Sequence, residues 1–138
     1  MLRTVLVLIP QVLGLMLASV PVQADGPGRI LYVIDGDTYD VAIGGVTSRA
    51  RLENADTPET GGARCAEERE AGDRATAFVR QQVVTRQVDV FTRWKIDKHR
   101  RLLVRVTVDG RDLGELLVVN GLGRYYRGER RMTWCPER

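Results

Sequence analysis

The chain has few of the residues on which several classes of active site depend. Its 138 residues include one histidine, His99, and two cysteines. A single histidine excludes histidine-rich metal sites and mechanisms that need a histidine pair, and two cysteines cannot complete a four-ligand structural zinc site. At roughly 100 to 200 residues per domain, the length leaves room for one hydrophobic core. Any catalysis must therefore rest on carboxylates and arginines.

An excess of one charge is also missing. Lys and Arg number 21 against 18 Asp and Glu, and a net charge of +3 is no electrostatic argument for nucleic acid. Lysine is rare, because 19 of the 21 basic residues are arginine. Arginine suits bidentate contact with phosphate, although a genome rich in G and C would give the same bias. The composition leaves the partner open.

The long apolar stretch of the chain lies within residues 1–24. It begins Met-Leu-Arg, is apolar from Val5 to Val20, and ends in Val22-Gln23-Ala24. These features are typical of a secretory signal peptide. A retained membrane anchor is the alternative, but the run is interrupted and short for a span of about 20 apolar residues. We expect cleavage after Ala24 and an exported protein, periplasmic or secreted, with one domain over 25–138 and no stable membrane association.

Export has a consequence for the two cysteines. In an oxidising compartment Cys65 and Cys135 could pair and tie the C-terminal tail to the start of the first expected helix. Two unpaired thiols are the alternative, because the sequence does not give the Cα separation that a disulfide requires.

The apolar pattern predicts a mixed α+β fold. Five stretches read as strands, over 29–34, 38–43, 46–52, 88–96 and 102–108. A long helix begins near Cys65 with acidic residues in its first turn, and a second, capped by Asp112, ends at Gly121. Five short strands with a helix between the third and fourth follow the order of the OB-fold, a small Greek-key barrel. An open five-stranded α+β sheet is the alternative.

One hairpin can be read in detail. Gly44-Gly45 is typical of a two-residue hairpin loop. Position 43 then pairs with 46, and Thr38 pairs with Arg51. Asp37 and Arg51 therefore become diagonal neighbours at the far end of the hairpin.

Two acidic segments flank this hairpin. Asp35-Gly36-Asp37 is not an EF-hand loop, because Tyr39, Asp40 and Val46 stand where its acidic ligand, glycine and glutamate are required. Read locally, it is an Asp-Gly turn, and Asp56-Thr57-Pro58-Glu59 is a capped turn with proline at the first helical position. Taken together, carboxylates at hairpin ends and arginines on strands favour a hard cation such as Ca²⁺ beside a phosphate.

At this point the motifs resemble the staphylococcal nuclease (thermonuclease) family in order and spacing. The resemblance covers roughly residues 29 to 126 and is carried by five pieces of sequence: Val33-Ile34-Asp35-Gly36-Asp37-Thr38, Arg51-Leu52, Asp56-Thr57-Pro58-Glu59-Thr60, Asp97-Lys98-His99-Arg100-Arg101, and Leu116 through Leu122. It implies an OB-fold and a Ca²⁺-dependent phosphodiesterase, an endonuclease that acts on DNA and RNA and leaves 3′-phosphate ends. It also implies a Ca²⁺ site in which Asp37 and Asp56 are carboxylate ligands and Thr57 is a ligand through its backbone carbonyl.

The resemblance further implies three catalytic residues. Glu59 would act on the attacking water, as a general base or by positioning it, and Arg51 and Arg101 would bind the scissile phosphate. Asp35 would be a turn residue that supports the site. Arg100 stands where the family usually has glycine, so the match at Arg101 rests on its place before Leu102.

Two other classes of function stay open. A non-catalytic OB-fold module would bind nucleic acid or another ligand without cleaving it. A structural or inhibitory exported domain would leave the joint occurrence of the motifs unexplained. In each case we expect a monomer.

Overall fold

The computed structural model describes residues 27–137, in which the chain forms a mixed α+β fold. A six-stranded sheet has the order β1-β2-β3-β6-β5, with β7 paired to β6, and comprises β1 (Arg29–Val33), β2 (Thr38–Ile43), β3 (Val46–Leu52), β5 (Val88–Ile96), β6 (Leu102–Val108) and β7 (Arg111–Asp112). A second, two-stranded sheet pairs β4 (Ala55–Asp56) with β8 (Arg124–Tyr125). The helices are α1 (Ala66–Thr85) and α2 (Leu113–Val119). The predicted signal peptide lies outside the described residues.

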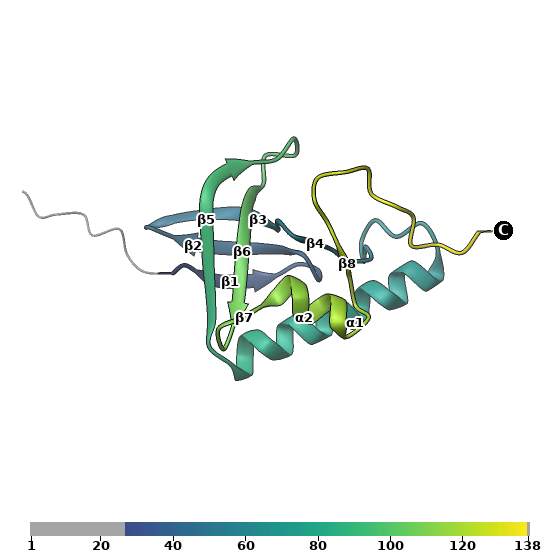
Figure 1. Ribbon diagram of the computed structural model, residues 1–138, viewed down its shortest axis with the longest axis horizontal. Helices are drawn as coiled ribbons and strands as arrows, with labels where there is room; N and C mark the ends of the chain where they lie inside the picture. Colours follow the sequence, from purple (N-terminus) through teal and green to yellow (C-terminus); the bar gives the residue numbers. More distant parts are fainter. Residues whose placement is uncertain (1–26, 138) are drawn as a thin grey trace, which may run out of the picture.

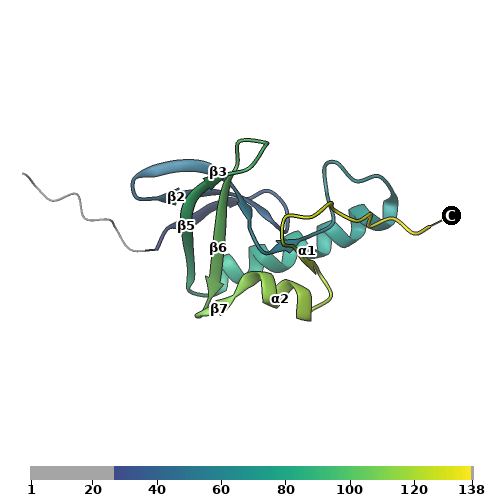
Figure 2. The same ribbon diagram turned by 45° about the horizontal axis from the view of Figure 1, so that its top comes forward.

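The five predicted strands are confirmed, with the first ending one residue early at Val33. The outer strands of the sheet meet, because Gly28, next to β1, forms a bridge with Val90 of β5 through hydrogen bonds of 2.7 and 2.8 Å. This contact is the one that turns a curved sheet into the barrel of an OB-fold. Both helices lie along one side of the strands in Figure 1, and the turned view in Figure 2 shows the same arrangement.

The hairpin of β2 and β3 has the predicted register. Ile43 pairs with Val46 and Thr38 pairs with Arg51. Gly44 and Gly45 have φ values of 55° and 76°, the left-handed conformation that a two-residue loop of type I′ requires at both positions. The far end of this hairpin carries the first part of the candidate site.

A parallel pairing joins the two halves of the sheet. Strand β3 lies beside β6, with Ala50 opposite Leu102 and Arg51 opposite Leu103. Leu102 is the first residue of β6 and directly follows the turn between β5 and β6, so this turn lies beside the last part of β3. The pairing therefore brings Arg51 and the turn before Leu102 to one groove.

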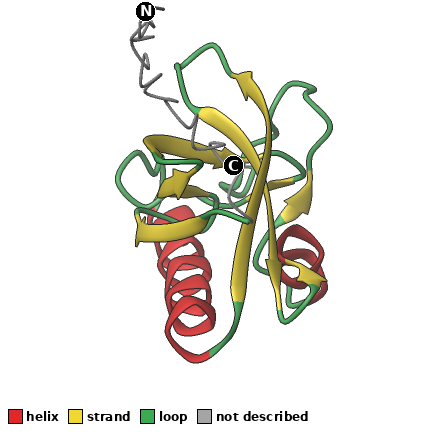
Figure 3. Cartoon of the chain, turned by 90° about the vertical axis from the view of Figure 1, so that its left-hand side faces the viewer, coloured by secondary structure: helices red, strands yellow, loops and turns green. Residues whose placement is uncertain are grey.

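The core lies inside the barrel and under the helices. Its largest fully buried apolar side chains come from four strands and both helices and include Tyr39, Val41, Leu52, Val79, Val90, Val104, Leu113 and Leu117. Both predicted helices are confirmed, and each has a side-chain cap: the Cys65 Sγ accepts from the Glu68 N–H, and the Asp112 Oδ1 accepts from the Glu115 N–H. In Figure 3 the two helices stand apart, with strands passing between them. Within residues 27–137 neither helix is long and apolar enough to cross a membrane.

The predicted disulfide is present. Cys65 and Cys135 are bonded with a Cα separation of 5.9 Å and are 70 residues apart in the sequence. Because Cys65 also caps α1, the bond fixes the C-terminal tail to the first turn of that helix.

Candidate active site

Two buried aspartates meet at one end of the barrel. Asp37 lies in the loop that leads into β2, and Asp56 lies in the short strand β4; they are 2% and 4% exposed. The Thr57 backbone N–H donates to the Asp37 Oδ2 at 2.7 Å. This bond ties the two acidic segments together, although they are 20 positions apart in the sequence.

Arg51 bridges the two aspartates. Its guanidinium forms an ion pair with the Asp37 Oδ1 and a second with the Asp56 Oδ1, the latter at 2.9 Å. Asp37 and Arg51 are therefore neighbours, as predicted, and they also form an ion pair. Burial of the guanidinium opposes its charge, but the two carboxylates outweigh this effect and raise the pKa of Arg51 above its usual value. Arg51 is thus a fixed buried cation rather than a solvent-facing strand residue.

The pKa of Asp35 indicates an excess of negative charge at this end of the barrel. Its Oδ1 accepts from the Asp37 N–H at 3.1 Å, as expected of a turn residue. Burial first, and then the charges of Asp37 and Glu59, raise the pKa of Asp35 from 3.8 to about 6. The negative charges of the site are therefore only partly compensated by its arginines.

The charges of the cluster can be counted. Four carboxylates gather here, those of Asp35, Asp37, Asp56 and Glu59. Two guanidinium groups, those of Arg51 and Arg131, contact carboxylates of this cluster. With all of these groups ionised, the cluster has a net charge of −2. Within residues 27–137 the buried hydroxyl oxygen of Thr57 has no hydrogen-bond partner. Carboxylate, carbonyl and hydroxyl oxygens are the donors that hard divalent cations take, so this set of residues fits Ca²⁺.

Glu59 lies beside the aspartates, on the segment that follows Pro58. Its Oε1 accepts from an Arg131 nitrogen at 2.9 Å. Helix α1 supports this segment through Gly72, where an added Cβ would lie 2.7 Å from the backbone oxygen of Glu59. Gly72 was not among the predicted site residues, although a glycine inside an amphipathic helix is itself a signal of close packing.

Arg101 lies in the same groove as Arg51 but does not contact Asp37 or Asp56. Its Nε donates to the Asp97 Oδ2 at 2.8 Å, and its backbone N–H donates to the Asp97 Oδ1 at 2.9 Å. Arg100 has a φ of 63°, a left-handed conformation in which glycine is usual. Desolvation acts against it, but the hydrogen bonds from Arg101 and His99 hold the pKa of Asp97 below its usual value.

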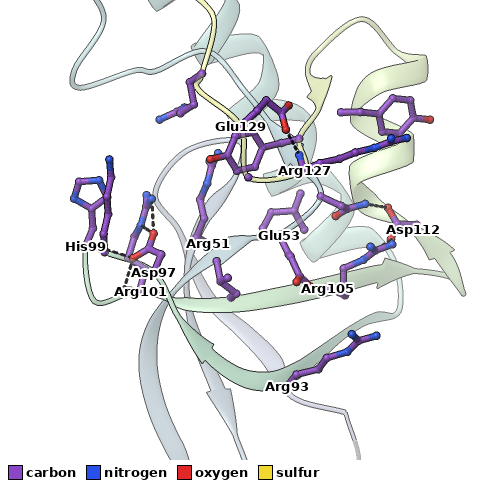
Figure 4. A pocket seen from close by; sticks show the side chains of 18 of the residues that line it. Arg51, Glu53, Arg93, Asp97, His99, Arg101, Arg105, Asp112, Arg127 and Glu129 are labelled. Atoms are coloured by element: carbon purple, nitrogen blue, oxygen red, sulfur yellow. Dashed lines mark hydrogen bonds and ion pairs between the residues drawn. The ribbon is translucent and has the colours of Figure 1, made fainter.

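The groove is large, and basic residues outnumber acidic ones in its lining. It has a volume of about 1530 Å³, and its basic lining residues include Arg51, Arg93, Arg101, Arg105, Arg127 and Arg131. Figure 4 shows Arg51 and Arg101 among the residues that line it, with Asp97 beside Arg101. The Tyr126 ring also lines it, with its centre 5.8 Å from the Arg51 guanidinium. Such a lining suits a polyanion with planar groups.

The C-terminal tail adds two residues that the sequence did not indicate. Arg131 forms ion pairs with Asp56 and Glu59, and the Trp134 indole N–H donates to the Asp56 Oδ2 at 3.1 Å. Neither residue belongs to a periodic segment. The one available signal was their position close to Cys135, whose pairing with Cys65 returns the tail to this end of the molecule.

Comparison with known proteins identifies the family. Residues 49–134, more than half of the chain, match the family described as "Staphylococcal nuclease homologue". The chain belongs to this family. The match includes Arg51, Asp56, Thr57, Glu59 and Arg101, and it also includes Arg131 and Trp134. Asp37 precedes the matched residues and joins the site through its contacts with Arg51 and Thr57.

Two curated relatives illustrate the family. The chain is 35% identical over 88 residues to a protein named micrococcal nuclease from Shigella flexneri, an alignment that covers 64% of this chain and 46% of the relative. It is 33% identical over 98 residues to an uncharacterised protein of Bacillus anthracis, covering 70% of this chain and 45% of that protein. The alignments thus span less than half the length of either relative.

Proposed function

We propose that the chain is a phosphodiesterase, an endonuclease that uses Ca²⁺ to hydrolyse DNA and RNA and leaves 3′-phosphate ends. Family membership and the similarity to a micrococcal nuclease support the nuclease class. The observation that carries the proposal is the buried Arg51 between Asp37 and Asp56, at a basic groove that also contains Arg101.

The oxygen donors of the site would have two roles: three residues would bind the cation, and one would act on the attacking water. Asp37 and Asp56 would hold the cation through their carboxylates, and Thr57 through its backbone carbonyl. When bound, the cation supplies Lewis-acid polarisation of a phosphoryl oxygen. Glu59, which is on the segment directly after these ligands, would take a proton from the attacking water or orient it toward phosphorus.

The two arginines would act on the phosphate. As water adds to phosphorus, negative charge grows on the equatorial oxygens, and a planar guanidinium can donate two parallel hydrogen bonds to them. Arg51 and Arg101 are both held by carboxylates before substrate arrives, so little reorganisation is needed. The bond from phosphorus to the 5′-oxygen breaks, the 5′-oxygen takes a proton, and the phosphate stays on the 3′-oxygen.

The remaining properties follow from the sequence. We propose removal of residues 1–24, export to the periplasm or medium, and action of residues 25–138 as a monomeric single domain without stable membrane association. N-terminal sequencing of the exported protein should begin at Asp25, and an intact Met1 in the membrane fraction would contradict the cleavage.

A cleavage assay tests the proposed activity. Single-stranded DNA and RNA should be cut in Ca²⁺ and left intact after chelation, and the products should be substrates for a 3′-phosphatase. Asp56→Asn should abolish cleavage, whereas Asp40→Asn, at a partly exposed aspartate paired with Arg49, should leave it unchanged. Full activity after chelation would overturn the metal-dependent mechanism. Binding of DNA without cleavage would instead favour the non-catalytic OB-fold module.

A further inference from the structure

The tail segment, defined as residues 131–135, lies directly against the candidate cation site. It carries a cation at one end, Arg131, and a disulfide at the other, Cys135. Between them Trp134 contacts Asp56. The segment therefore reaches the site through two side chains whose chemistry differs.

Arg131 contacts the same groups that the proposed function assigns to the cation and the water. Its Nε pairs with the Asp56 Oδ1, one terminal nitrogen pairs with the Glu59 Oε1 at 2.9 Å, and the other lies 3.5 Å from the Thr57 carbonyl oxygen. Arg51 also pairs with the Asp56 Oδ1, so a cation that takes this oxygen is repelled by both guanidinium groups. Arg51 is buried on β3, whereas the Arg131 side chain is 34% exposed and lies in the tail, so Arg131 is the group that can leave when the cation binds.

Trp134 contacts Asp56 in a way that is compatible with a cation. Its indole N–H is a neutral donor, and it bonds to Oδ2, whereas Arg131 contacts Oδ1. The bond orients the carboxylate without cancelling its charge. Donors of this kind fix the rotamer of a metal-binding carboxylate, and their loss weakens metal binding.

The tail is built to stay in place. The Arg124 guanidinium stacks on the Trp134 ring, 3.6 Å from its centre. The backbone of Arg124 lies opposite that of Asp56 in the strand pair of β4 and β8. Arg124 also donates to the Thr133 backbone oxygen at 2.9 Å. The bond between Cys135 and Cys65 holds the tail close to the site, so both contacts with Asp56 act at a higher effective concentration.

We propose that the tail segment sets the cation affinity of the site through two contacts with Asp56 that have opposite effects. Arg131 competes with the cation and leaves when it binds. Trp134 is a positioning residue that holds the carboxylate in the orientation the cation uses. This inference rests on the proposed function, since it concerns the same cation site.

Calorimetric titration of the metal-free protein with Ca²⁺ tests the competition. Arg131→Gln should bind Ca²⁺ more tightly on the order of tenfold, because charge-assisted contacts no longer have to be broken. Arg130→Gln is the matched control, since it removes the same charge from the neighbouring residue, for which no contact with these carboxylates is seen in residues 27–137. Equal tightening by both variants would overturn the competition, because it would reflect only the general loss of positive charge.

The same titration tests the positioning role. Trp134→Phe keeps an aromatic ring for Arg124 to stack on and loses the N–H, so Ca²⁺ binding should weaken about tenfold, while the thermal midpoint of the metal-free protein stays close to that of the unaltered chain. Trp94→Phe, at an exposed tryptophan, should change neither value. Unchanged Ca²⁺ affinity in Trp134→Phe would overturn the positioning role.

A nitrogen–proton NMR spectrum gives a readout that does not depend on variants. The Arg131 Nε–H should exchange slowly without metal and rapidly with Ca²⁺, whereas the Trp134 indole N–H should stay protected in both states. Slow exchange of the Arg131 Nε–H with Ca²⁺ bound would contradict its displacement. If neither the unaltered protein nor Arg131→Gln binds Ca²⁺, the proposed cation site itself fails. If both bind equally well, the proposed function stands and this inference fails.

Discussion

The Asp97 carboxylate binds both the backbone N–H and the guanidinium of Arg101. One carboxylate oxygen accepts from the Arg101 backbone N–H and the other from its guanidinium, so a single aspartate fixes both the turn and the direction of the arginine. Within residues 27–137 Asp97 is the one ion-pair partner of Arg101, so it alone orients the guanidinium in the groove.

Asp97→Asn should lower kcat more than it raises KM, because Arg101 loses its anchor and must be ordered during each reaction cycle. It should also change the pH dependence of stability. The pKa of Asp97 in the folded state lies below its ordinary value of 3.8, so its contribution to the free energy of unfolding is present above that pH and is lost as the pH falls through the folded-state pKa. Urea unfolding should therefore separate the two proteins at neutral pH and bring them together in acid. A constant difference at all pH values would contradict this.

The two adjacent arginines of the turn should behave differently. Arg101→Lys should reduce kcat about a hundredfold with little change in the affinity for DNA, since lysine keeps the charge but loses the planar fork. Arg100→Lys should be nearly silent, because the left-handed backbone of Arg100 gives it no place in the Asp97 pair. Steady-state kinetics on both variants measure this. A severe Arg100→Lys with a silent Arg101→Lys would mean that the catalytic arginine is assigned one position too late.

Gly72→Ala should lower the free energy of unfolding by about 1 to 3 kcal/mol, because the new Cβ would overlap the backbone oxygens of Pro58 and Glu59. The sign of this change in the free energy of unfolding is informative, since alanine normally stabilises a helix by about 1 kcal/mol relative to glycine. Activity should fall as well, because the Glu59 segment is displaced. Ala77→Gly, at an exposed position of α1, is the control and should cost about 1 kcal/mol without loss of activity. A stabilised, fully active Gly72→Ala would exclude the close contact.

Replacing both cysteines by serine should lower the free energy of unfolding on the order of 4 kcal/mol, since the bond closes a loop of 70 residues. Serine at position 65 keeps a helix-capping side chain, so the loss measures the cross-link and not the cap. Denaturant unfolding of the oxidised protein and of the double variant gives the value. A free-thiol titration that finds two thiols in the unreduced, denatured protein would contradict the bond.

The local features of the fold were predictable, and the reason is visible at particular residues. The register that pairs Thr38 with Arg51 follows from a period of two and from Gly44-Gly45, both of which are encoded within a few residues. The predicted cap at Asp112 is likewise local. The short pairing of Asp56 with Arg124 was missed, because a ladder of two residues has no periodicity.

The tertiary environment of the site was less accessible to sequence reasoning. Alternation along β3 gave the face on which Arg51 lies but not its burial between two carboxylates, which depends on closure of the barrel end. The contacts of Arg131 and Trp134 were missed for a related reason. They lie in an irregular tail and reach Asp56 from more than seventy positions away.

The parallel pairing of β3 with β6 has a consequence for the order in which the protein folds. The hairpins β2–β3 and β5–β6 each close a short loop, whereas the β3–β6 pair joins segments on either side of the whole of α1 and must close a long one. Arg51 and Arg101 belong to different hairpins and come together only at this late step. A nascent or partly folded chain therefore has neither the groove nor the pair of phosphate-binding arginines, and hydrolytic capacity should appear with the final cooperative transition of refolding rather than with secondary structure.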